Sequence, residues 1–294
     1  MKLKNVAVIG LVLAGAVGAV ISFVVFAAII NGTPGDDTLS DPPPPAPPTN
    51  DVIRGFAGDD DITVNAGNDR VDAGDDDDQI TIANTAGRVY VVGGNGNDVI
   101  DASGGINHRI FGNDGDDNIL VGNGVLGSRT DGGDGDDVID LNASNGNHVV
   151  YGGLGDDEIE GIDCGNPTAT PPLRCNLKIY GGPGQDNITL GFGSNFVEPG
   201  EDADVVVAGT AEGSQDVINI RVGDVPAGET EKITCTVNAG ATTTVILKRN
   251  SLGAFPPGTP TQFDASGVLT IIDPVTGGVY EIRRGDGTCI IVRR

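Results

Sequence analysis

The chain has 294 residues, 47 glycines, no tryptophan and a formal net charge of −25 at pH 7. Its hydrophobic content of 38% is ordinary for a folded protein, so the acidic charge does not by itself imply disorder. The acids are concentrated between residues 32 and 220, where 35 acidic side chains accompany only 7 basic ones. Such a segment repels nucleic acid as well as itself, which excludes nucleic acid as a partner and requires cations.

The N-terminal segment, residues 1–31, is apolar apart from two lysines near its start. Residues 6–30 carry no charge and are long enough to span a membrane, with the lysines on the cytoplasmic side. Ala27 and Ala28 also suit cleavage of a signal peptide, and a helix packed in a filament core is a third reading. The anchor and the cleaved signal both predict that the rest of the chain is extracytoplasmic, either secreted or attached at the cell surface.

Four cysteines agree with export, because disulfides form in oxidising compartments. Cys164 and Cys175 flank a proline-rich insert, whereas Cys235 and Cys289 both lie near the end of the sequence. Three sets of pairings are open from the sequence, and we predict Cys164–Cys175 and Cys235–Cys289. No CxxC pair or nearby histidine completes a zinc site.

One acidic, glycine-rich turn recurs along the chain, each time before a short apolar run. The copies GGNGNDVID, GGDGDDVID, GGLGDDEIE and GGPGQDNIT begin at residues 93, 132, 152 and 181. The copies align on the Asp at the sixth position of the turn, and an aliphatic residue always follows it two positions later. The aligned aspartates are Asp37, Asp51, Asp60, Asp69, Asp78, Asp98, Asp117, Asp137, Asp157, Asp186 and Asp216.

The spacing of these aspartates changes along the chain. The step is nine residues from Asp51 to Asp78, and nineteen or twenty from Asp78 to Asp157. A repeat of this kind predicts a solenoid, in which stacked coils bury a column of aliphatic side chains. The longer units contain a returning strand: RVYVV, HRIF, HVVY, LKIY and, at residues 204–208, DVVVA. We therefore expect acidic turns on both edges in the nine-residue region and on one edge afterwards.

The turns resemble RTX repeats, the calcium-binding nonapeptides GGxGxDxUx in which U is aliphatic. The four copies quoted above match every defined position, and GFAGDDDIT, GTPGDDTLS and FGNDGDDNIL match with one glycine replaced or shifted. The resemblance covers residues 32 to 190 and implies a β-roll with several Ca²⁺ ions between successive turns. It implies metal ligands at Asp60, Asp69, Asp78, Asp98, Asp117, Asp137, Asp157 and Asp186.

Three further aspartates fit the motif incompletely. The proline-rich spacer removes the turn that would follow Asp37, Asp51 lacks the preceding glycines, and Asp216 follows AEGSQ. The chemistry of the turns favours calcium independently, because calcium takes six to eight oxygen ligands in flexible geometry whereas magnesium demands a tighter octahedron. The plain alternative is that the aspartates only shape loops. However, carboxylates stacked at the strand spacing of ~4.8 Å would repel one another without a cation.

Two smaller patterns accompany the repeats. Phe111, Tyr151 and Tyr180 each stand just before a turn glycine, where we expect them to pack along the solenoid, with carbohydrate binding as the alternative. His108 and His148 begin returning strands and are predicted to be exposed surface residues.

The predicted fold class is all-β: a calcium-binding β-roll with an N-terminal hydrophobic helix and a small antiparallel β domain at the C-terminal end. We divide the chain into an anchor or signal (1–31), a lone repeat with a proline-rich spacer (32–50), the solenoid (51–220) and a C-terminal cap (221–294). The cap is predicted from strand-like runs separated by turn signals such as DPVTGG.

The function predicted from these features is structural rather than enzymatic. No GxSxG, HExxH or phosphate-loop motif occurs, and no catalytic residue is assigned. We expect an exported calcium-binding protein of a surface layer, matrix, adhesive or filament, with self-association as a partner interaction. The alternatives are a secreted polysaccharide lyase or epimerase on a β-helix scaffold, and a glycan-binding module.

Overall fold

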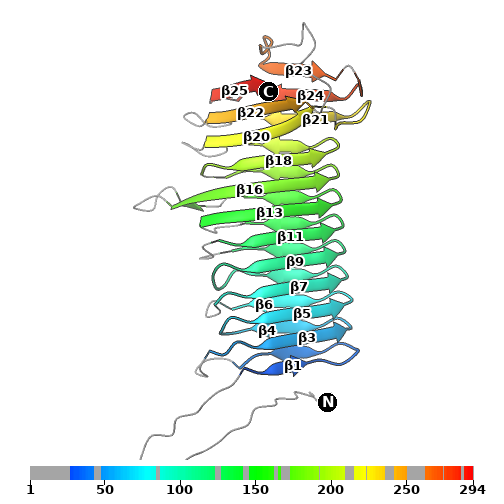
Figure 1. The fold of residues 1–294 in the computed structure, drawn as a ribbon, viewed down its shortest axis with the longest axis vertical. Helices are drawn as coiled ribbons and strands as arrows, with labels where there is room; N and C mark the ends of the chain where they lie inside the picture. The colour runs from blue at the N-terminus through cyan, green and yellow to red at the C-terminus, as the bar shows by residue number, and fades with distance from the viewer. Residues whose placement is uncertain are drawn as a thin grey trace, which may run out of the picture.

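The chain winds into a tall stack of coils, and the strands of successive coils form two sheets (Figure 1). The computed structural model describes residues 27–42, 48–83, 87–122, 127–141, 146–161, 165–166, 173–191, 193–208, 215–222, 224–235, 242–249, 262–273, 275–285 and 288–293. Regular structure in these residues is β-strand throughout, and the predicted all-β solenoid is confirmed. Within the same residues, no helix has the length and hydropathy needed to cross a membrane.

The solenoid starts before its predicted boundary at residue 51, and its first strand lies within the segment 1–31. The predicted N-terminal helix and most of the apolar segment 6–30 lie outside the described residues. The last residues of that segment form β1 (Ile29–Asn31), which pairs in parallel with β3 (Val52–Ala57). Ile30 is buried in the core, so the first coil begins within the segment assigned to an anchor or signal.

One sheet contains most of the longer strands, and we call it the wide sheet. Its order is β1, β3, β5 (Arg70–Asp75), β7 (Tyr90–Asn95), β9 (Arg109–Asp114), β11 (Arg129–Asp134), β13 (Gly146–Leu154), β16 (Leu173–Pro183), β18 (Phe196–Glu201), β20 (Gln215–Val222), β22 (Thr242–Arg249) and β25 (Thr288–Arg293). The short β15 (Gly165–Asn166) pairs with β16 outside this path.

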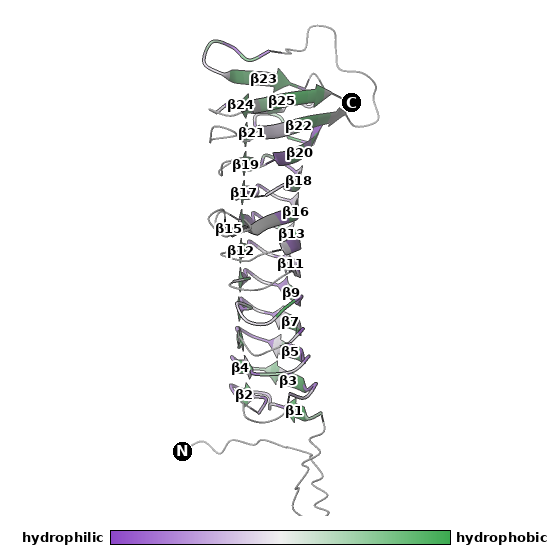
Figure 2. Ribbon diagram, turned by 90° about the vertical axis from the view of Figure 1, so that its left-hand side faces the viewer, coloured by the Kyte–Doolittle hydropathy of each residue, from purple (hydrophilic) through white to green (hydrophobic). Residues whose placement is uncertain are grey.

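The second sheet, which we call the narrow sheet, contains strands of three to five residues. Its order is β2 (Thr38–Ser40), β4 (Asp61–Val64), β6 (Gln79–Ile82), β8 (Val99–Asp101), β10 (Asn118–Leu120), β12 (Val138–Asp140), β14 (Glu158–Glu160), β17 (Asn187–Thr189), β19 (Val205–Val207), β21 (Thr230–Thr234), β24 (Val279–Arg283) and β23 (Val268–Ile272). The two sheets face each other across the core (Figure 2).

Each coil runs along a wide strand, through an acidic turn, along a narrow strand and back through a return loop. Arg70 of β5 pairs with Val52 of β3, eighteen residues earlier, and with Tyr90 of β7, twenty residues later. The nine-residue unit is therefore half a coil, and its aspartates alternate between two edges. We call the side that carries the wide-to-narrow turns the acidic edge, and the opposite side the return edge.

Aliphatic side chains form continuous columns between the sheets. Ile80, Ile100 and Ile119 pair across adjacent narrow strands, and each is fully buried. Every aliphatic residue that follows an aligned aspartate by two positions is likewise buried. Burying one such side chain contributes ~1.5–3 kcal/mol relative to leaving it exposed. Because a single coil leaves its aliphatic residue open above and below, the fold depends on stacking.

Residues 221–294 continue both sheets, whereas their turn signals predict an antiparallel domain. In the wide sheet, β20, β22 and β25 pair in parallel, and in the narrow sheet β19, β21 and β24 do so. Among the described strands of this segment, antiparallel pairing is confined to β23 with β24. A strand, a turn and a second strand give similar local signals in a hairpin and in a coil, so the sequence pattern did not distinguish them.

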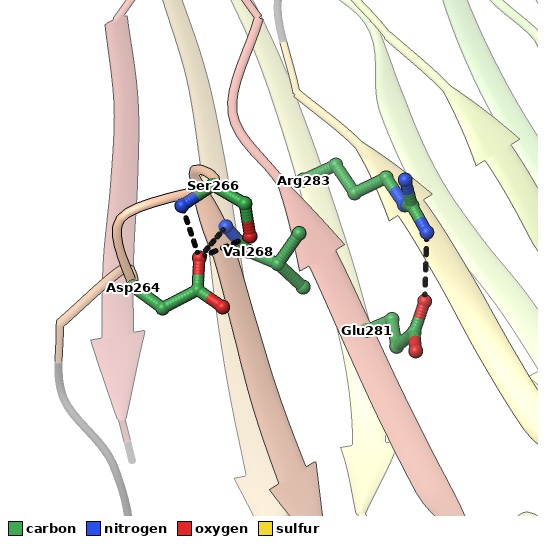
Figure 3. A network of polar contacts seen from close by, with 5 residues as sticks. All are labelled: Asp264, Ser266, Val268, Glu281 and Arg283. Carbon is green, nitrogen blue, oxygen red and sulfur yellow. Dashed lines mark hydrogen bonds and ion pairs between the residues drawn. The ribbon is translucent and has the colours of Figure 1, made fainter.

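The end of the stack is closed by a turn and a disulfide. The Asp264 carboxylate accepts the backbone N–H groups of Ser266 and Val268, both at 2.9 Å, in the turn before β23 (Figure 3). Cys235, at the end of β21, is joined to Cys289 of β25, so the bridge links the narrow sheet to the wide sheet. The structure thus contains one predicted bridge. The other, Cys164–Cys175, lies outside the residues whose side chains are described.

Candidate calcium-binding edge

The acidic edge places one aspartate of each coil directly above that of the preceding coil. Strand pairing on the narrow sheet sets this register, because each aspartate immediately precedes a narrow strand. We call the resulting row the acidic column. It consists of Asp37, Asp60, Asp78, Asp98, Asp117, Asp137, Asp157, Asp186 and Asp204.

One carboxylate oxygen of each column member after Asp37 accepts a backbone N–H of the preceding coil. The N–H of Asp117 donates to Oδ1 of Asp137 at 2.8 Å, and the N–H of Asp137 donates to Oδ1 of Asp157 at 3.0 Å. The same hydrogen bond joins every other neighbouring pair in the column, at 2.7 to 3.0 Å. These bonds satisfy backbone donors that the tight turns leave inside the edge.

The second carboxylate oxygen is buried and has no hydrogen-bond partner. This applies to Oδ2 of Asp60, Asp78, Asp98, Asp117, Asp137, Asp157, Asp186 and Asp204. Each of these side chains is at most 2% exposed. An unpaired buried polar group costs about 1–3 kcal/mol, and more when it is charged. A line of such oxygens therefore indicates a site built for cations.

The unpaired oxygens converge with carbonyl oxygens of the next coil beside the first glycine of each turn. A Cβ built on Gly132 would lie 2.0 Å from Oδ2 of Asp137 and 2.5 Å from the carbonyl oxygen of Gly152. Calcium–oxygen distances are of similar size, ~2.3–2.6 Å, so this donor set fits a hard cation. Among the described residues, no three His, Cys, Asp or Glu side chains gather at one point, and main-chain oxygens belong to the donor set.

The glycines at the second and fourth positions of the turn are explained by their backbone conformation. Gly133 and Gly135 have φ angles of 132° and 140°, a region that glycine enters without steric penalty. Where the motif is incomplete, Phe56, Asp76 and Asn113 occupy the equivalent positions and also have positive φ. The turn therefore keeps its shape in copies that lack a glycine.

Burial changes the proton affinity of the acidic column. Burial raises the pKa of Asp137 to about 8. The hydrogen bond from the backbone N–H of Asp117 lowers this pKa, and the neighbouring carboxylates raise it further. Burial likewise raises the pKa of Asp186 to about 7 and of Asp204 to about 8. Burial therefore favours the protonated form of these carboxyl groups unless a positive charge lies beside them.

A second ladder on the outer rim of the acidic edge was missed from the sequence. It consists of the residues directly before the column members: Asp59, Asp77, Asn97, Asp116, Asp136, Asp156 and Gln185. Its bonds run the opposite way, since the N–H of Asp156 donates to Oδ1 of Asp136 at 2.8 Å. The signal was present as an Asp or Asn before most aligned aspartates, but such residues are also common in ordinary turns.

Two predicted site residues, Asp51 and Asp69, lie on the return edge, as expected for the nine-residue region. The N–H of Asp51 donates to Oδ1 of Asp69 at 2.6 Å. Oδ2 of Asp69 is buried without a partner, and burial raises the pKa of this group to about 7. Oδ2 of Asp51, in contrast, accepts the Thr49 hydroxyl at 2.7 Å.

Asp216 also lies on the return edge, away from the acidic column. Its Oδ1 accepts the backbone N–H of Asn195 at 3.3 Å and the side-chain amide at 2.8 Å. The column member that follows Asp186 is Asp204, which the sequence analysis placed in a returning strand. In the structure, residues 205–207 form the narrow strand β19. A proline and an aspartate replace glycines in this turn, which concealed the repeat.

Histidines replace aspartates in later coils of the return edge. Nδ1 of His108 accepts the backbone N–H of Val89, and Nδ1 of His148 accepts that of Ser128, both at 3.1 Å. The prediction that the histidines are exposed is wrong, because their exposed fractions are 1% and 0%. Burial lowers the pKa of His108, and Nε2 lies 2.5 Å from the carbonyl oxygen of Gly104. The neutral ring therefore donates from Nε2 and accepts at Nδ1.

Aromatic rings stack along the outer face of the wide sheet, as predicted. The Tyr151 and Tyr180 rings lie 4.9 Å apart at an interplanar angle of 11°, and those of Tyr90 and Phe111 lie 5.4 Å apart. The Arg129 guanidinium lies over the Tyr151 ring at 4.5 Å. These contacts run from coil to coil and reinforce the stacking.

Comparison with known families agrees with this geometry. The model of the RTX calcium-binding nonapeptide repeat matches the chain in four copies, at residues 48–80, 85–108, 109–125 and 178–210. No curated protein matches the chain. The turns between the third and fourth copies have the same hydrogen bonds and unpaired oxygens as the matched ones. The chain is therefore a β-roll protein that carries RTX-type calcium-binding nonapeptide repeats.

Proposed function

We propose that the protein is an exported structural protein of the cell surface whose solenoid folds around a row of calcium ions. The line of buried, unpaired Oδ2 atoms along the acidic column carries this proposal. The ligands are assigned to Asp60, Asp78, Asp98, Asp117, Asp137, Asp157, Asp186 and the newly identified Asp204. Asp37 closes the first turn. Its Oδ2 accepts the N–H of Thr33 at 2.5 Å, so its part in a site is smaller.

The aspartates of the return edge fit the proposal less completely. Asp69 keeps one unpaired oxygen and is the candidate for a single ion there. The oxygens of Asp51 are engaged by Ala28 and Thr49, and Oδ1 of Asp216 is engaged by Asn195. On this edge, hydrogen bonding within the protein therefore takes over much of the role that cations fill on the other.

The side chains of the acidic column perform two tasks. Oδ1 fixes the register of each coil on the one before it, and Oδ2 presents negative charge beside the next coil's carbonyl. Bound calcium supplies the positive charge that lets these carboxylates ionise together. Because both donors come together only in the stacked solenoid, the free energy of metal binding stabilises the fold.

The chemistry of the chain supports export and a surface role. The bridge between Cys235 and Cys289 suits an oxidising compartment, and calcium sites of this kind suit the calcium-rich exterior of cells. The predicted anchor or signal within residues 6–30 would deliver the solenoid there. A long, rigid stack is suited to a layer, matrix, adhesive or filament, in which copies associate.

Calcium titration of the full-length protein in mild detergent tests the proposal. We expect a reversible gain of β-sheet circular dichroism, several ions bound per chain, and little response to magnesium. Full β structure in chelator, with no calcium bound on titration, would contradict it. Labelling of intact cells with a membrane-impermeant reagent tests the location, and labelling only after lysis would contradict export.

A glycan-binding role is the second candidate, and the outer face of the wide sheet favours it. Two adjoining hollows of about 480 and 450 Å³ share Arg88 and Arg109 in their linings, with Arg70 in the first and Arg129 in the second. Guanidinium groups beside stacked rings suit an anionic sugar polymer. Binding to carboxylated polysaccharides that is lost in the double variant Arg109→Ala, Arg129→Ala would support this role, and no binding to any such polymer would remove it.

A further inference from the structure

The acidic column does not end with the last repeat. In the next coil, Lys232 pairs with Val205, and its N–H donates to the carbonyl oxygen of Asp204 at 2.7 Å. Glu231, the residue before Lys232, therefore stands directly after Asp204 in the stack. This glutamate follows the sequence PAGET and lies beyond residue 210, where the last repeat match ends.

Glu231 shares two features of the column, its burial and an unpaired carboxylate oxygen, although it belongs to no repeat. It is 3% exposed, and its Oε1 is buried without a hydrogen-bond partner. Asp204, beneath it, is fully buried and has an unpaired Oδ2. Two buried carboxyl groups with unpaired oxygens thus occupy successive coils.

Asp204 and Glu231 lie in acidic surroundings close to the C-terminal end of the stack. Burial raises the pKa of Glu231 well above its ordinary value, and the charges of Asp204 and Asp224 raise it further. Asp224 begins the loop that leads into β21, in which Gly228 has a φ of 90°. On the far side of Glu231, strand pairing places Tyr280 of β24. Ionisation of both carboxyl groups at this position therefore requires a compensating positive charge.

We propose that Asp204 and Glu231 hold a closing divalent cation of the calcium type between the last repeat coil and the C-terminal cap. The inference rests on the proposed function, since it extends the same kind of oxygen site beyond the repeats. Its role is to join β19 and β21 across the acidic edge, while the Cys235–Cys289 bridge joins the two sheets one coil further on. The repeat region and the cap then unfold together.

The variant Glu231→Gln tests the site in the full-length protein, with Glu281→Gln as its matched control. Glu281 lies on the neighbouring strand β24 and only pairs with Arg283 at the surface (Figure 3). By equilibrium dialysis, we expect Glu231→Gln to bind one calcium ion fewer per chain and Glu281→Gln to bind as many as wild type. In saturating calcium the first variant should melt at a lower temperature than wild type. In chelator it should melt at the same or a higher temperature, because a buried charge is gone.

The outcomes separate this inference from the proposed function. If wild type binds several ions and Glu231→Gln binds the same number with the same melting temperature, the closing site is overturned and the repeat sites stand. If wild type binds no calcium, both proposals fall.

Terbium luminescence gives a second measurement that does not depend on the stability of the Glu231 variant. Tb³⁺ replaces calcium in oxygen sites and emits when a nearby tyrosine is excited. Tyr280 neighbours Glu231 on the narrow sheet, whereas Tyr90, Tyr151 and Tyr180 lie on the outer face of the wide sheet. We expect Tyr280→Phe to remove a distinct part of the emission without lowering the number of ions bound. Unchanged emission would overturn the site.

Discussion

On the acidic edge, Asp137 accepts the backbone N–H of Asp117, and on the return edge His148 accepts that of Ser128. Both side chains satisfy the same kind of donor, one coil back, from a buried position. The aspartate keeps a second carboxylate oxygen that has no hydrogen-bond partner, whereas an imidazole ring offers no anionic oxygen. Acceptance of backbone N–H groups is therefore common to both edges, whereas a continuous row of unpaired carboxylate oxygens is found on the acidic edge.

The largest effect is expected from removing charge in the middle of the acidic column. In the triple variant Asp117→Asn, Asp137→Asn, Asp157→Asn, each amide can still accept the preceding N–H but no longer offers an anionic oxygen. We expect calcium stoichiometry to fall and calcium-dependent stabilisation to drop by about 2.7 kcal/mol per lost site at a calcium concentration 100 times Kd. Urea unfolding with and without calcium measures this.

A matched control removes three exposed charges from turns of the same edge. The variant Asp75→Asn, Asp114→Asn, Asp134→Asn changes residues at the third turn position, and all three are exposed. Its calcium stoichiometry should remain that of wild type. An equal loss in both triple variants would show that net charge, and not the column, governs binding.

Filling the space beside the first glycine of one turn should have the next largest effect. In Gly132→Ala, the new Cβ would lie 2.0 Å from Oδ2 of Asp137, so the turn must shift or the carboxylate must rotate away. We expect the loss of one ion and about 1–3 kcal/mol of destabilisation, which isothermal titration and thermal melting measure. The control is Gly35→Ala, whose Cβ meets nothing within 4 Å. Retention of all ions by Gly132→Ala would contradict the assigned position.

The acidic column and His108 should respond to pH in opposite senses. The folded pKa of Asp137 is raised from 3.8 to about 8, so in chelator its contribution to stability is complete below 3.8 and is lost as pH rises toward 8. The folded pKa of His108 is lowered from 6.5, so its contribution is present above 6.5 and is lost as pH falls.

Urea midpoints measured at low and neutral pH separate the two contributions. In chelator, the midpoint should be higher at about pH 5 than at about pH 8. In saturating calcium the order should reverse, because protons then compete with calcium and charge the buried histidine. The same order in both conditions would contradict the assignment of calcium to the acidic column.

The smallest effect is expected on the return edge. In His148→Asn, the amide oxygen can take the place of Nδ1, as Asn195 does when it accepts the N–H of Leu177 at 3.0 Å. We expect a change in unfolding free energy of less than about 1 kcal/mol. In His148→Ala the N–H of Ser128 loses this acceptor, and about 1–3 kcal/mol should be lost. Calcium stoichiometry should be unchanged in both, and a lost ion would show that the edges are not independent.

The sequence by itself determined the repeat, the coil length and most of the acidic column. A turn with defined glycines, an Asp and an Ile two residues later combines local backbone geometry with strand periodicity, and neither needs tertiary information. The same pattern recurs on both edges in the nine-residue region, so the halving of the coil was also readable. The pairing of Cys235 with Cys289 was among the three open possibilities.

Only the tertiary structure decided which edge each later aspartate occupies. Asp204 and Asp216 are both followed two positions later by a buried aliphatic residue, so local pattern does not rank them. Register with β17 assigns Asp204 to the column, and pairing of β20 with β18 assigns Asp216 to the return edge. The burial of His108 and the parallel direction of β22 and β25 were hidden for the same reason. Each depends on which coil lies next to it, and stacking is a contact between segments that the local sequence does not encode.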